Sequence, residues 1–580
     1  MFRESSPNKQ SSMFDILQLI APKMQERLLS SWAQTFRQDV LARIPEKVFA
    51  VLFSEVDSRP NAPIQVMVGG EILKAGFGWT DEELEDHLEF DLLTRYALGL
   101  DAVGAEAPTL RTFYNLRRRV REYAEESGKN LYSEVFATIT DQQIAKVELK
   151  TGWQRLDSTQ LLSNIARMNR LELVISVLQT GVRGLPAEAS QEWEQAQAGY
   201  LSKPAQNICY RLKAEESEPH LVAIGQLLLT LLAQLQASQA EPGVISVIER
   251  AIADHYQIET DGQVSIRPAS QMSGDSLQSP HDPEATYRQK NGQSYKGYVT
   301  NLSETCDPEN PVQLITSVQT ATNTTDDGQL LADTLDDLAA RQIAIEQATV
   351  DGGFNGPTSE DACRQHGVKL RPTTIRGGQS AAGRFGWEAY TWTLDEAGQP
   401  SQVGCPKGQT VPVEPGGKAG WFLARFDEQL CAECPFFKKA CRVKPRQRTS
   451  PTLNVKLRSI QVACLRQGMS ADNAAIRANV ESTIHAFKHP FAGGKLPVRG
   501  LIRAHMMACG SALMVNLRRL HDYFYPEHSV AVDNNSILPS LPRFGRALAG
   551  FWSFLRRSRA VMLANYGHSA NHLLLTDGCC

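Results

Sequence analysis

The stretch AIEQATVDGGF, residues 344–354, combines a predicted buried strand with an aspartate and two glycines at its end. The segment Ala344 to Val350 is the predicted strand, which ends at Asp351. A second predicted strand, Trp153 to Leu156, also ends at an aspartate, Asp157. Charged groups at the carboxyl ends of strands in an α/β sheet point into the crevice where ligands bind, and glycines there allow a close approach. We therefore expect Asp157 and Asp351 to belong to a functional site.

Further strand and helix patterns surround these two strands. Strands are predicted at 295–299, 312–318 and 368–371, and helices at 329–340 and from Pro357 onward. Strands with helices between them indicate a mixed sheet. The expected fold class is therefore α/β.

The N-terminal part of the chain has a helical pattern from residue 13 to about residue 123. Thr80-Asp81-Glu82-Glu83 is a capping box that predicts the start of a helix. The third of three short predicted helices follows Pro108 and has a basic face that includes Arg117 and Arg118. Three short helices ending in a basic one fit a helix-turn-helix type of DNA reader. An ordinary helical bundle with a solvated basic face has the same pattern, so both interpretations stay open.

The length of 580 residues predicts several domains rather than one core. Residues 182–258 are rich in Ala, Gln, Glu and Leu, whereas residues 376–450 are rich in Gly and Pro and contain four cysteines. The predicted division is a disordered tail (1–12), a helical N-terminal DNA-binding domain (13–145), the start of the α/β domain (146–181), a helical insert (182–258), the α/β domain continued (259–375), a cysteine-containing insert (376–450), the end of the α/β domain (451–525) and a C-terminal tail (526–580).

The charge of the chain is distributed unevenly. The formal net charge is -4, but residues 431–580 contain 21 Lys and Arg against 7 Asp and Glu. Such asymmetry suggests that the C-terminal quarter meets a polyanion. The alternative is that a basic half of the protein packs on an acidic half.

Several classes of protein are disfavoured by the sequence. No secretory signal or membrane span is expected, and the apolar run 220–235 is interpreted as a buried helix. The odd number of 11 unevenly spaced cysteines argues for reduced thiols and a cytoplasmic protein. No G-x-x-x-x-G-K-[ST] loop occurs, which removes the main route to an ATP-driven motor.

A third candidate carboxylate, Glu481, lies in a predicted helix between two basic residues. Arg477 precedes it by four residues and Lys488 follows it by seven, so all three lie on roughly one helical face. A carboxylate flanked by cations suits a metal ion beside phosphates. The plain alternative is a set of solvated surface charges, since the chain contains 64 acidic residues.

Four cysteines form a possible zinc site, namely Cys405, Cys431, Cys434 and Cys441. A C-x2-C pair with two further thiols matches the ligand count of a structural zinc site; the alternative is four reduced thiols, or thiols partly buried in a small β insert. The basic segment 438–448 follows the C-x2-C pair and begins with Lys438 and Lys439, beside two phenylalanines. It is a candidate for DNA-backbone contact, or a solvated loop.

The order of these motifs resembles bacterial insertion-sequence DDE transposases, over about residues 51–523 and most weakly in the helical insert. The segments that carry the resemblance are Trp79–Glu85, Phe90–Leu92, Leu98–Leu100, Pro108–Thr109, Leu156–Thr159, Ser279–Ala285, Tyr295–Tyr298, Val350–Phe354 and Asn516–Leu520. Arg477, Glu481 and Lys488 fall at the intervals of the family's third motif. The tyrosine of that motif is replaced by Ala474, which puts one DNA contact in doubt.

The resemblance implies a ribonuclease-H-like catalytic domain with a helical N-terminal domain, a helical insert and a small cysteine-bearing β insert. Asp157, Asp351 and Glu481 would be the catalytic residues and would hold Mg²⁺ or Mn²⁺, which prefer oxygen ligands. Arg477 and Lys488 would neutralise DNA phosphates. The implied reaction is cleavage of transposon ends, at terminal inverted repeats, and strand transfer into target DNA, by a homodimer on double-stranded DNA in the bacterial nucleoid.

Two other functions share these residues. A metal-dependent nuclease without strand transfer would have the same carboxylates. An inactive DNA-binding descendant of a transposase is disfavoured by the presence of all three acids, whereas Ala474 slightly favours it.

Overall fold

The computed structural model describes residues 2–4, 16–54, 60–102, 104–210, 212–259, 262–290, 292–373, 383–395, 398–446, 449–467 and 471–526, with only the backbone for 471–478. Most of the two predicted tails, 1–12 and 526–580, therefore lies outside the described residues, as do the side chains of Ala474 and Arg477. The chain divides into two compact units, Met1–His521 and Asp522–Cys580.

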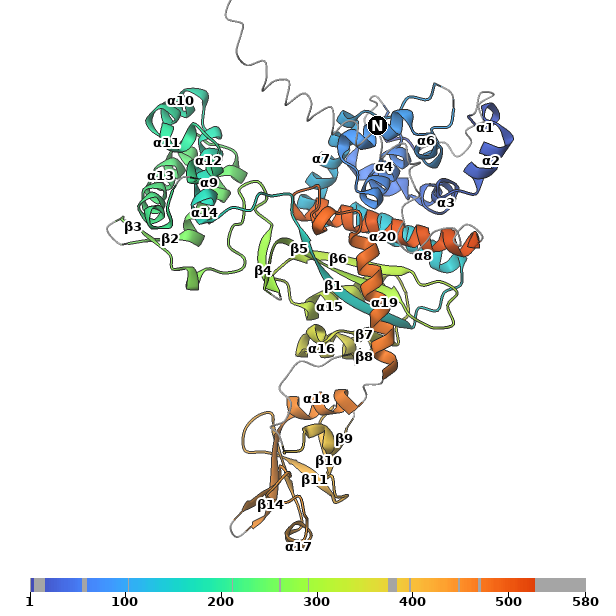
Figure 1. Cartoon of the computed structure of the whole chain (residues 1–580), viewed down its shortest axis with the longest axis vertical. Coiled ribbons are helices and arrows are strands. Elements are labelled where there is room, and N and C mark those ends of the chain that lie inside the picture. The colour runs from blue at the N-terminus through green and yellow to red at the C-terminus, as the bar shows by residue number, and fades with distance from the viewer. Residues whose placement is uncertain are drawn as a thin grey trace, which may run out of the picture. The chain divides into compact units, whose positions relative to one another are not determined.

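A mixed sheet contains both predicted aspartate strands (Figure 1). Its strands are β1 (Trp153–Leu162), β4 (Thr286–Lys290), β5 (Gln293–Thr305), β6 (Ile315–Thr322), β7 (Gln347–Val350) and β8 (Lys369–Pro372). The hydrogen-bonded order is β4-β5-β1-β7-β8, and β6 also pairs with β5. The pairs of β5 with β1, β4 and β6 are antiparallel, whereas β1, β7 and β8 are parallel. The predicted α/β class is confirmed, and this arrangement is compatible with a ribonuclease-H-like sheet.

Strand β1 is longer than the sequence predicts. It continues from Trp153 to Leu162, because its pairing with the 13-residue strand β5 runs from Gln154 opposite Thr305 to Leu162 opposite Gly297. Asp157 therefore lies inside the strand rather than after its end.

Helices cover both faces of the sheet (Figure 1). On one face, α15 (Asp327–Ala340) and α16 (Pro357–Gln365) pack against Leu156 and Val350. On the other face, α19 (Ala471–Lys488) contacts β1 and β7, and α20 (Leu501–Phe524) shares a core with Leu302. Because side chains alternate along a strand, Leu156 faces the α15 side and Asp157 the α19 side.

The N-terminal helices belong to the same core as α20. They are α1 (Ile16–Leu19), α2 (Pro22–Leu29), α3 (Trp32–Asp39), α4 (Ile64–Phe77), α5 (Asp81–Phe90), α6 (Leu92–Ala97), α7 (Leu110–Ser127) and α8 (Leu131–Lys146). The capping box at the start of α5 is present, with Thr80 and Glu83 each accepting from the other's backbone N–H. The shared core joins α4 and α20 closely.

The helical insert has a hydrophobic core of its own. Its elements are α9 (Arg170–Arg183), α10 (Ala187–Ala196), α11 (Ala198–Leu201), α12 (Ala205–Cys209), α13 (Ser217–Ala237), α14 (Pro242–His255), β2 (Tyr256–Ile258) and β3 (Val264–Ile266). Helix α9 packs in this core, although the sequence analysis assigned residues 170–181 to the α/β domain. Helical periodicity indicates a buried face but not which core buries it.

Helix α13 is, among the described residues, the one helix long and apolar enough to cross a membrane by length and composition. Core helices of soluble proteins pass the same test. Its apolar stripe, which includes Leu221, Ile224, Leu228, Leu231 and Leu235, is buried in the core of the insert.

The cysteine-containing insert is a second sheet of six antiparallel strands. Its elements are β9 (Thr391–Leu394), β10 (Pro400–Gly404), β11 (Thr410–Pro415), β12 (Trp421–Arg425), α17 (Glu428–Ala432), β13 (Lys444–Arg446), β14 (Thr449–Lys456) and α18 (Leu457–Gln467). The strand order is β13-β14-β12-β11-β10-β9. This sheet has a core of its own, which extends past the predicted end of the insert at residue 450 to include β14 and α18.

Candidate active site

Asp157 and Asp351 lie at the same level of two neighbouring parallel strands. Arg155 of β1 is opposite Thr349 of β7; Asp157 follows two residues later within β1, and Asp351 follows directly after the end of β7. Both aspartates are half-buried. The sheet thus brings together two residues separated by almost 200 positions in the sequence.

Backbone N–H groups hold both carboxylates. Ser158 N donates to Asp157 Oδ1 over 2.8 Å. Gly353 N donates to Asp351 Oδ1 over 2.5 Å, so Asp351 caps the short 3-10 helix η5 (Gly352–Phe354). Such bonds favour the ionised carboxylate and fix its orientation.

A third carboxylate at this edge, Asp327, was missed by the sequence analysis. Asp327 Oδ1 accepts from Ser158 Oγ over 2.9 Å, and Asp327 is 8% exposed. A Cβ placed on Gly353 would be 2.8 Å from both Asp327 Oδ2 and Asp351 Oδ1. The two oxygens are thus no further apart than twice that distance, and only glycine fits between them.

The signal for Asp327 was present but ambiguous. Asp326 and Asp327 stand at the start of α15, and acidic residues there are normally explained by helix capping. Asp326 does cap the helix, since its side chain accepts from Gly328 N. Nothing in the sequence distinguishes the capping Asp326 from Asp327, which lies beside Gly353.

Glu481 lies on α19, the helix that contacts both β1 and β7. Its neighbours Val480 and Thr483 are buried at 1% and 0% exposure, whereas Glu481 is exposed. The helix therefore brings Glu481 to the side of the sheet that Asp157 faces.

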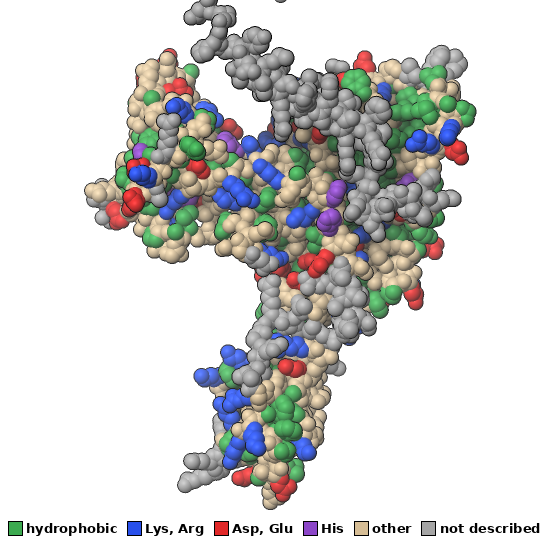
Figure 2. All heavy atoms as spheres, in the orientation of Figure 1, with side chains coloured by type: hydrophobic (Ala, Val, Ile, Leu, Met, Phe, Trp, Pro, Cys, Tyr) green, Lys and Arg blue, Asp and Glu red, His purple; other side chains and the backbone are tan. Residues whose placement is uncertain are grey.

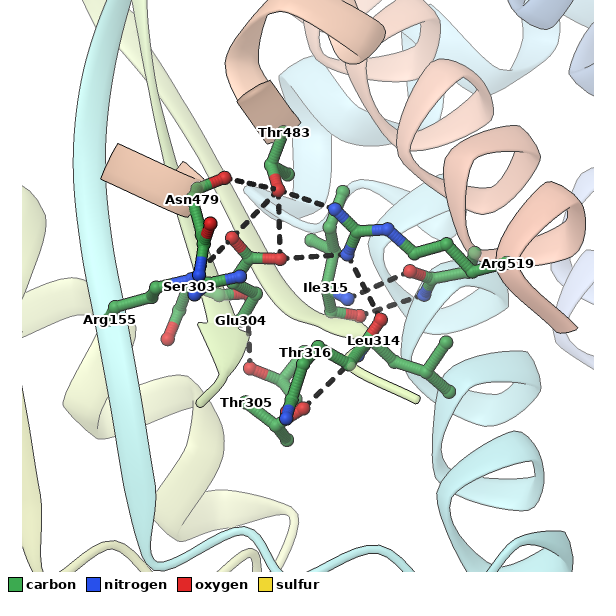
Figure 3. A network of polar contacts seen from close by, with 12 residues as sticks. Arg155, Ser303, Glu304, Thr305, Leu314, Ile315, Thr316, Asn479, Thr483 and Arg519 are labelled. Atoms are coloured by element: carbon green, nitrogen blue, oxygen red, sulfur yellow. Dashed lines mark hydrogen bonds and ion pairs between the residues drawn. The ribbon is translucent and has the colours of Figure 1, made fainter. Parts of the chain in front are cut away.

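A buried polar network anchors α19 two residues after Glu481 (Figure 3). Glu304 of β5, which is fully buried, accepts from Arg155 Nε over 2.7 Å, from Thr483 Oγ1 over 2.7 Å and from Arg519 Nη1 over 2.7 Å. Arg519 also donates to Thr483 Oγ1 and, over 3.0 Å, to the carbonyl of Gln313. The network ties β1, β5, α19 and α20 together and restricts where Glu481 can lie.

Asn516 gives a second tie between α20 and the sheet. Its Oδ1 accepts from Ile315 N over 2.7 Å, and its Nδ2 donates to the Ile315 carbonyl over 2.9 Å. The side chain thus pairs with the first residue of β6 as a neighbouring strand would. This gives Asn516 and Arg519, both in the segment 516–520, structural roles.

In the part of the chain that the structure describes, no group of three or more His, Cys, Asp or Glu side chains is arranged to hold a metal ion. Asp157, Asp351 and Glu481 share one region but do not form a closed ligand set. Their donor chemistry, carboxylate oxygens, still fits a hard divalent cation such as Mg²⁺.

Arg117 has a structural role that the sequence did not indicate. Its side chain is 12% exposed, and it donates to Glu71 Oε1 over 2.6 Å and to Asp81 Oδ1 over 2.7 Å. Burial opposes ionisation of Asp81, but the hydrogen bonds from Arg117 and Lys74 outweigh it and lower the pKa of Asp81 to about 2. This placement argues against a phosphate contact by Arg117.

The other predicted DNA-binding residues lie at or near the surface. Arg118 is exposed and pairs with Glu122 over 2.9 Å. Lys438 and Lys439 are exposed in the β insert. Lys488 is half-buried at the end of α19, and burial, followed by the nearby Lys290, lowers its pKa.

The four cysteines of the β insert lie near one another. Burial, followed by repulsion from Cys441, Cys405 and Cys434, raises the pKa of the Cys431 thiol to about 11. Cys441 Sγ is 3.3 Å from the Tyr390 hydroxyl. As placed, the thiols do not form a ligand set, so zinc stays a prediction.

Comparison with known proteins points to one family. Residues 404–521 match the family model of the Transposase DDE domain. The matched segment includes Glu481 and the four cysteines, whereas Asp157 and Asp351 lie before it. The match supports a DDE transposase and, with it, an enzyme that acts on DNA.

No curated protein matches the chain. Among solved structures, the chain is similar to the cryo-EM structure of a piggyBac transposase synaptic complex with hairpin DNA. The two chains are 9% identical with a TM-score of 0.22, over 93% of this chain and 85% of that chain.

Proposed function

We propose that the protein is the DNA transposase of a bacterial insertion sequence, which cleaves the ends of the element and joins them to target DNA. The observation that supports the proposal is the parallel pairing of β1, which contains Asp157, with β7, which Asp351 follows; α19 contacts both strands and carries Glu481, which lies within the matched transposase segment. Double-stranded DNA is the proposed partner, bound by a homodimer.

Asp157, Asp351 and Glu481 would hold Mg²⁺ or Mn²⁺. When bound, the cation supplies a Lewis acid that activates water or a 3′-hydroxyl and stabilises the leaving oxygen of the scissile phosphate. The backbone N–H groups of Ser158 and Gly353 orient the two aspartates, and the Glu304 network positions the helix of Glu481. Lys488, on the same helix, would contact a DNA phosphate.

The test is cleavage of a plasmid that carries the DNA flanking the coding sequence on both sides. Asp157→Asn, Asp351→Asn and Glu481→Gln should each lower Mg²⁺-dependent cleavage by about 10³-fold, the effect of losing one electrostatic stabiliser, with unchanged DNA binding. Asp361→Asn, which removes an exposed carboxylate of α16, is the matched control. Normal cleavage by any of the three variants would remove that residue from the site.

Strand transfer separates this function from a simple nuclease. Pre-cut element ends with free 3′-hydroxyls should be joined to a second plasmid by the wild-type chain. Cleavage without joining would favour the nuclease, and neither activity would favour the inactive descendant.

We also propose that Cys405, Cys431, Cys434 and Cys441 bind a structural zinc ion in a reducing cytoplasm. All nine cysteines in the described part of the chain are free thiols. The purified chain should contain about one zinc, which Cys431→Ser should lose and Cys464→Ser, a control in the same insert, should retain. A parent chain without zinc would refute this proposal.

A further inference from the structure

Three cations from distant parts of the sequence converge on the segment 163–169, which links β1 to α9. Lys296 Nζ donates to the Met168 carbonyl over 3.0 Å, and Lys495 Nζ to the Ile165 carbonyl over 3.3 Å. Arg499 Nε donates to the Asn164 carbonyl over 2.7 Å. The folded chain thus gathers positive charge that the sequence scatters over some 200 residues.

These cations have neutral partners. Within the described residues, no carboxylate lies within ion-pair distance of Lys296, Lys495 or Arg499. Glu172, an acid close enough to influence Lys296, accepts from Asn169 N in a capping box. A carbonyl orients a cation without cancelling its charge, so this surface keeps its full attraction for an anion.

A cavity of about 470 Å³ adjoins the segment and extends the basic surface. Arg183, Lys203 and His281 line it together with Arg499, against one carboxylate, Glu194. Burial, followed by repulsion from Arg499 and Arg183, lowers the pKa of His281. A bound anion would relieve that repulsion.

The basic surface continues towards the carboxylate edge. Leu162, the last residue of β1, forms a β-bridge with Lys495, and Asp157 lies five residues earlier on the same strand. Five strand residues span about 17 Å, which equals about five base pairs of B-form DNA. Figure 2 shows Lys and Arg side chains gathered on the face over β4 and β5.

We propose that Lys296, Lys495, Arg499, Arg183 and Lys203 form a basic groove that binds the backbone phosphates of duplex DNA about five base pairs from the cleavage point. The proposal rests on the proposed transposase function for the position of the cut. The groove is not expected to recognise a DNA sequence, because Lys and Arg contacts to phosphates position the protein on the duplex but do not distinguish bases. It is distinct from Lys438 and Lys439 in the β insert.

The test measures the affinity of the full chain for a 40-base-pair duplex over a range of KCl concentrations, by fluorescence anisotropy without divalent cations. The double variant K495Q/R499Q should lower the slope of log affinity against log salt by about 2 and weaken binding at 0.1 M KCl roughly 50-fold. The charge-preserving variant K495R/R499K should keep the wild-type slope. The matched control K407Q/K418Q removes two exposed lysines of the β insert and should also keep it.

Two further arms keep the result decisive. If K495Q/R499Q fails to fold, the rim variant R183Q/K203Q, whose two side chains are exposed, should show the same fall in slope. Phosphate ethylation about five base pairs from the cut should interfere with binding of the wild type. If the folded variants keep the wild-type slope of log affinity against log salt, the groove proposal is refuted, even if DNA cleavage is normal. If the variants show a reduced salt slope but the wild-type chain does not cleave DNA, the proposed groove is supported and the proposed transposase function is refuted.

Discussion

Glu304 is a fully buried carboxylate held by two guanidinium groups and a hydroxyl. Replacing it with Gln leaves Arg155 and Arg519 facing a neutral amide in the interior. Loss of one partner from a buried charge network costs about 3–5 kcal/mol, so Glu304→Gln should lower the denaturant midpoint strongly. Because Thr483 and the two guanidinium groups would then share one neutral amide oxygen, α19 is held less firmly, and DNA cleavage should fall along with stability.

The matched control is Glu309→Gln, which breaks the exposed pair with Lys150. Its midpoint should equal that of the wild type, because exposed ion pairs are screened by solvent. Equal midpoints for Glu304→Gln and the control would show that the network does not stabilise the fold.

His505 is a buried histidine whose protonation opposes folding. Its Nε2 lies 2.8 Å from Ser133 Oγ and 3.3 Å from Cys509 Sγ, and burial lowers its pKa to about 4. In the unfolded chain this histidine has a pKa of about 6.5. As the pH falls from 6.5 to 4, it is therefore protonated in the unfolded chain but stays neutral in the folded chain. The stability contributed by neutral His505 is thus complete above pH 6.5 and is lost towards pH 4.

His505→Gln should therefore flatten the pH dependence of unfolding. The wild type should lose about 2 kcal/mol from this group between pH 6.5 and pH 5, and the variant should not. Denaturant unfolding at several pH values measures the difference, with the exposed His489→Gln as control. Parallel curves for wild type and His505→Gln would contradict the prediction.

Single residues show where sequence reasoning succeeded and where it stopped. Asp157 and Asp351 were chosen because each follows a local strand pattern, although β1 in fact continues past Asp157 to Leu162. Asp327 was missed because its position beside Gly353 depends on the packing of α15, which a local pattern does not contain. Arg117 was predicted to contact DNA because it lies in a basic helix. Its acidic partners, Glu71 and Asp81, lie on other helices, so the neighbouring sequence does not reveal them.

At the scale of elements, α4 and α20 approach each other unusually closely through small residues. A Cβ on Gly510 would lie 2.7 Å from Ala75 Cβ and 3.3 Å from Ile72 Cα. Since the second atom is backbone, the helices must move apart to accept a methyl group. Gly510→Ala should thus destabilise the fold by about 1–3 kcal/mol, despite the higher helix propensity of Ala.

Gly199→Ala provides the comparison, because Gly199 is helical and its Cβ would meet nothing within 4 Å. Thermal unfolding followed by circular dichroism should show a lower midpoint for Gly510→Ala and an unchanged or higher one for Gly199→Ala. A midpoint for Gly510→Ala at or above that of the wild type would show that the helices adjust freely.

Elements were largely predictable because their signals are local. The capping box at Thr80 and the helix preceding Asp351's strand follow from neighbouring residues, and the structure has them. The length of β1 was not predictable, since it is set by pairing with β5 more than 130 residues later. Sheet partners decide strand ends, and they are absent from the local sequence.

At the scale of the molecule, separate hydrophobic cores indicate parts that unfold separately. The helical insert has its own core, which runs from Leu171 to Leu277. Arg170 donates to the carbonyls of His255 and Arg267, so it holds the entry and exit of the insert together. The sequence predicted the insert from composition, whereas only the packing shows that α9 belongs to its core.

A chain in which a short Gly-Ser linker replaces residues 170–266 should therefore still fold. Its calorimetric trace should lack one transition and retain the main one within a few degrees, because the core shared by α4, α20 and the sheet contains no residue of the insert. The ends of the deleted segment lie close together, so a short linker adds little closure entropy.

The same deletion removes Arg183 and Lys203, two cations of the basic groove, but leaves Lys296, Lys495 and Arg499 in place. The slope of DNA affinity against salt should hence fall by about 2 rather than vanish. An unfolded remainder would show that the insert is needed for the main core. A folded remainder with the full slope would mean that the phosphates are bound elsewhere, because counterion release counts only the cations that touch DNA.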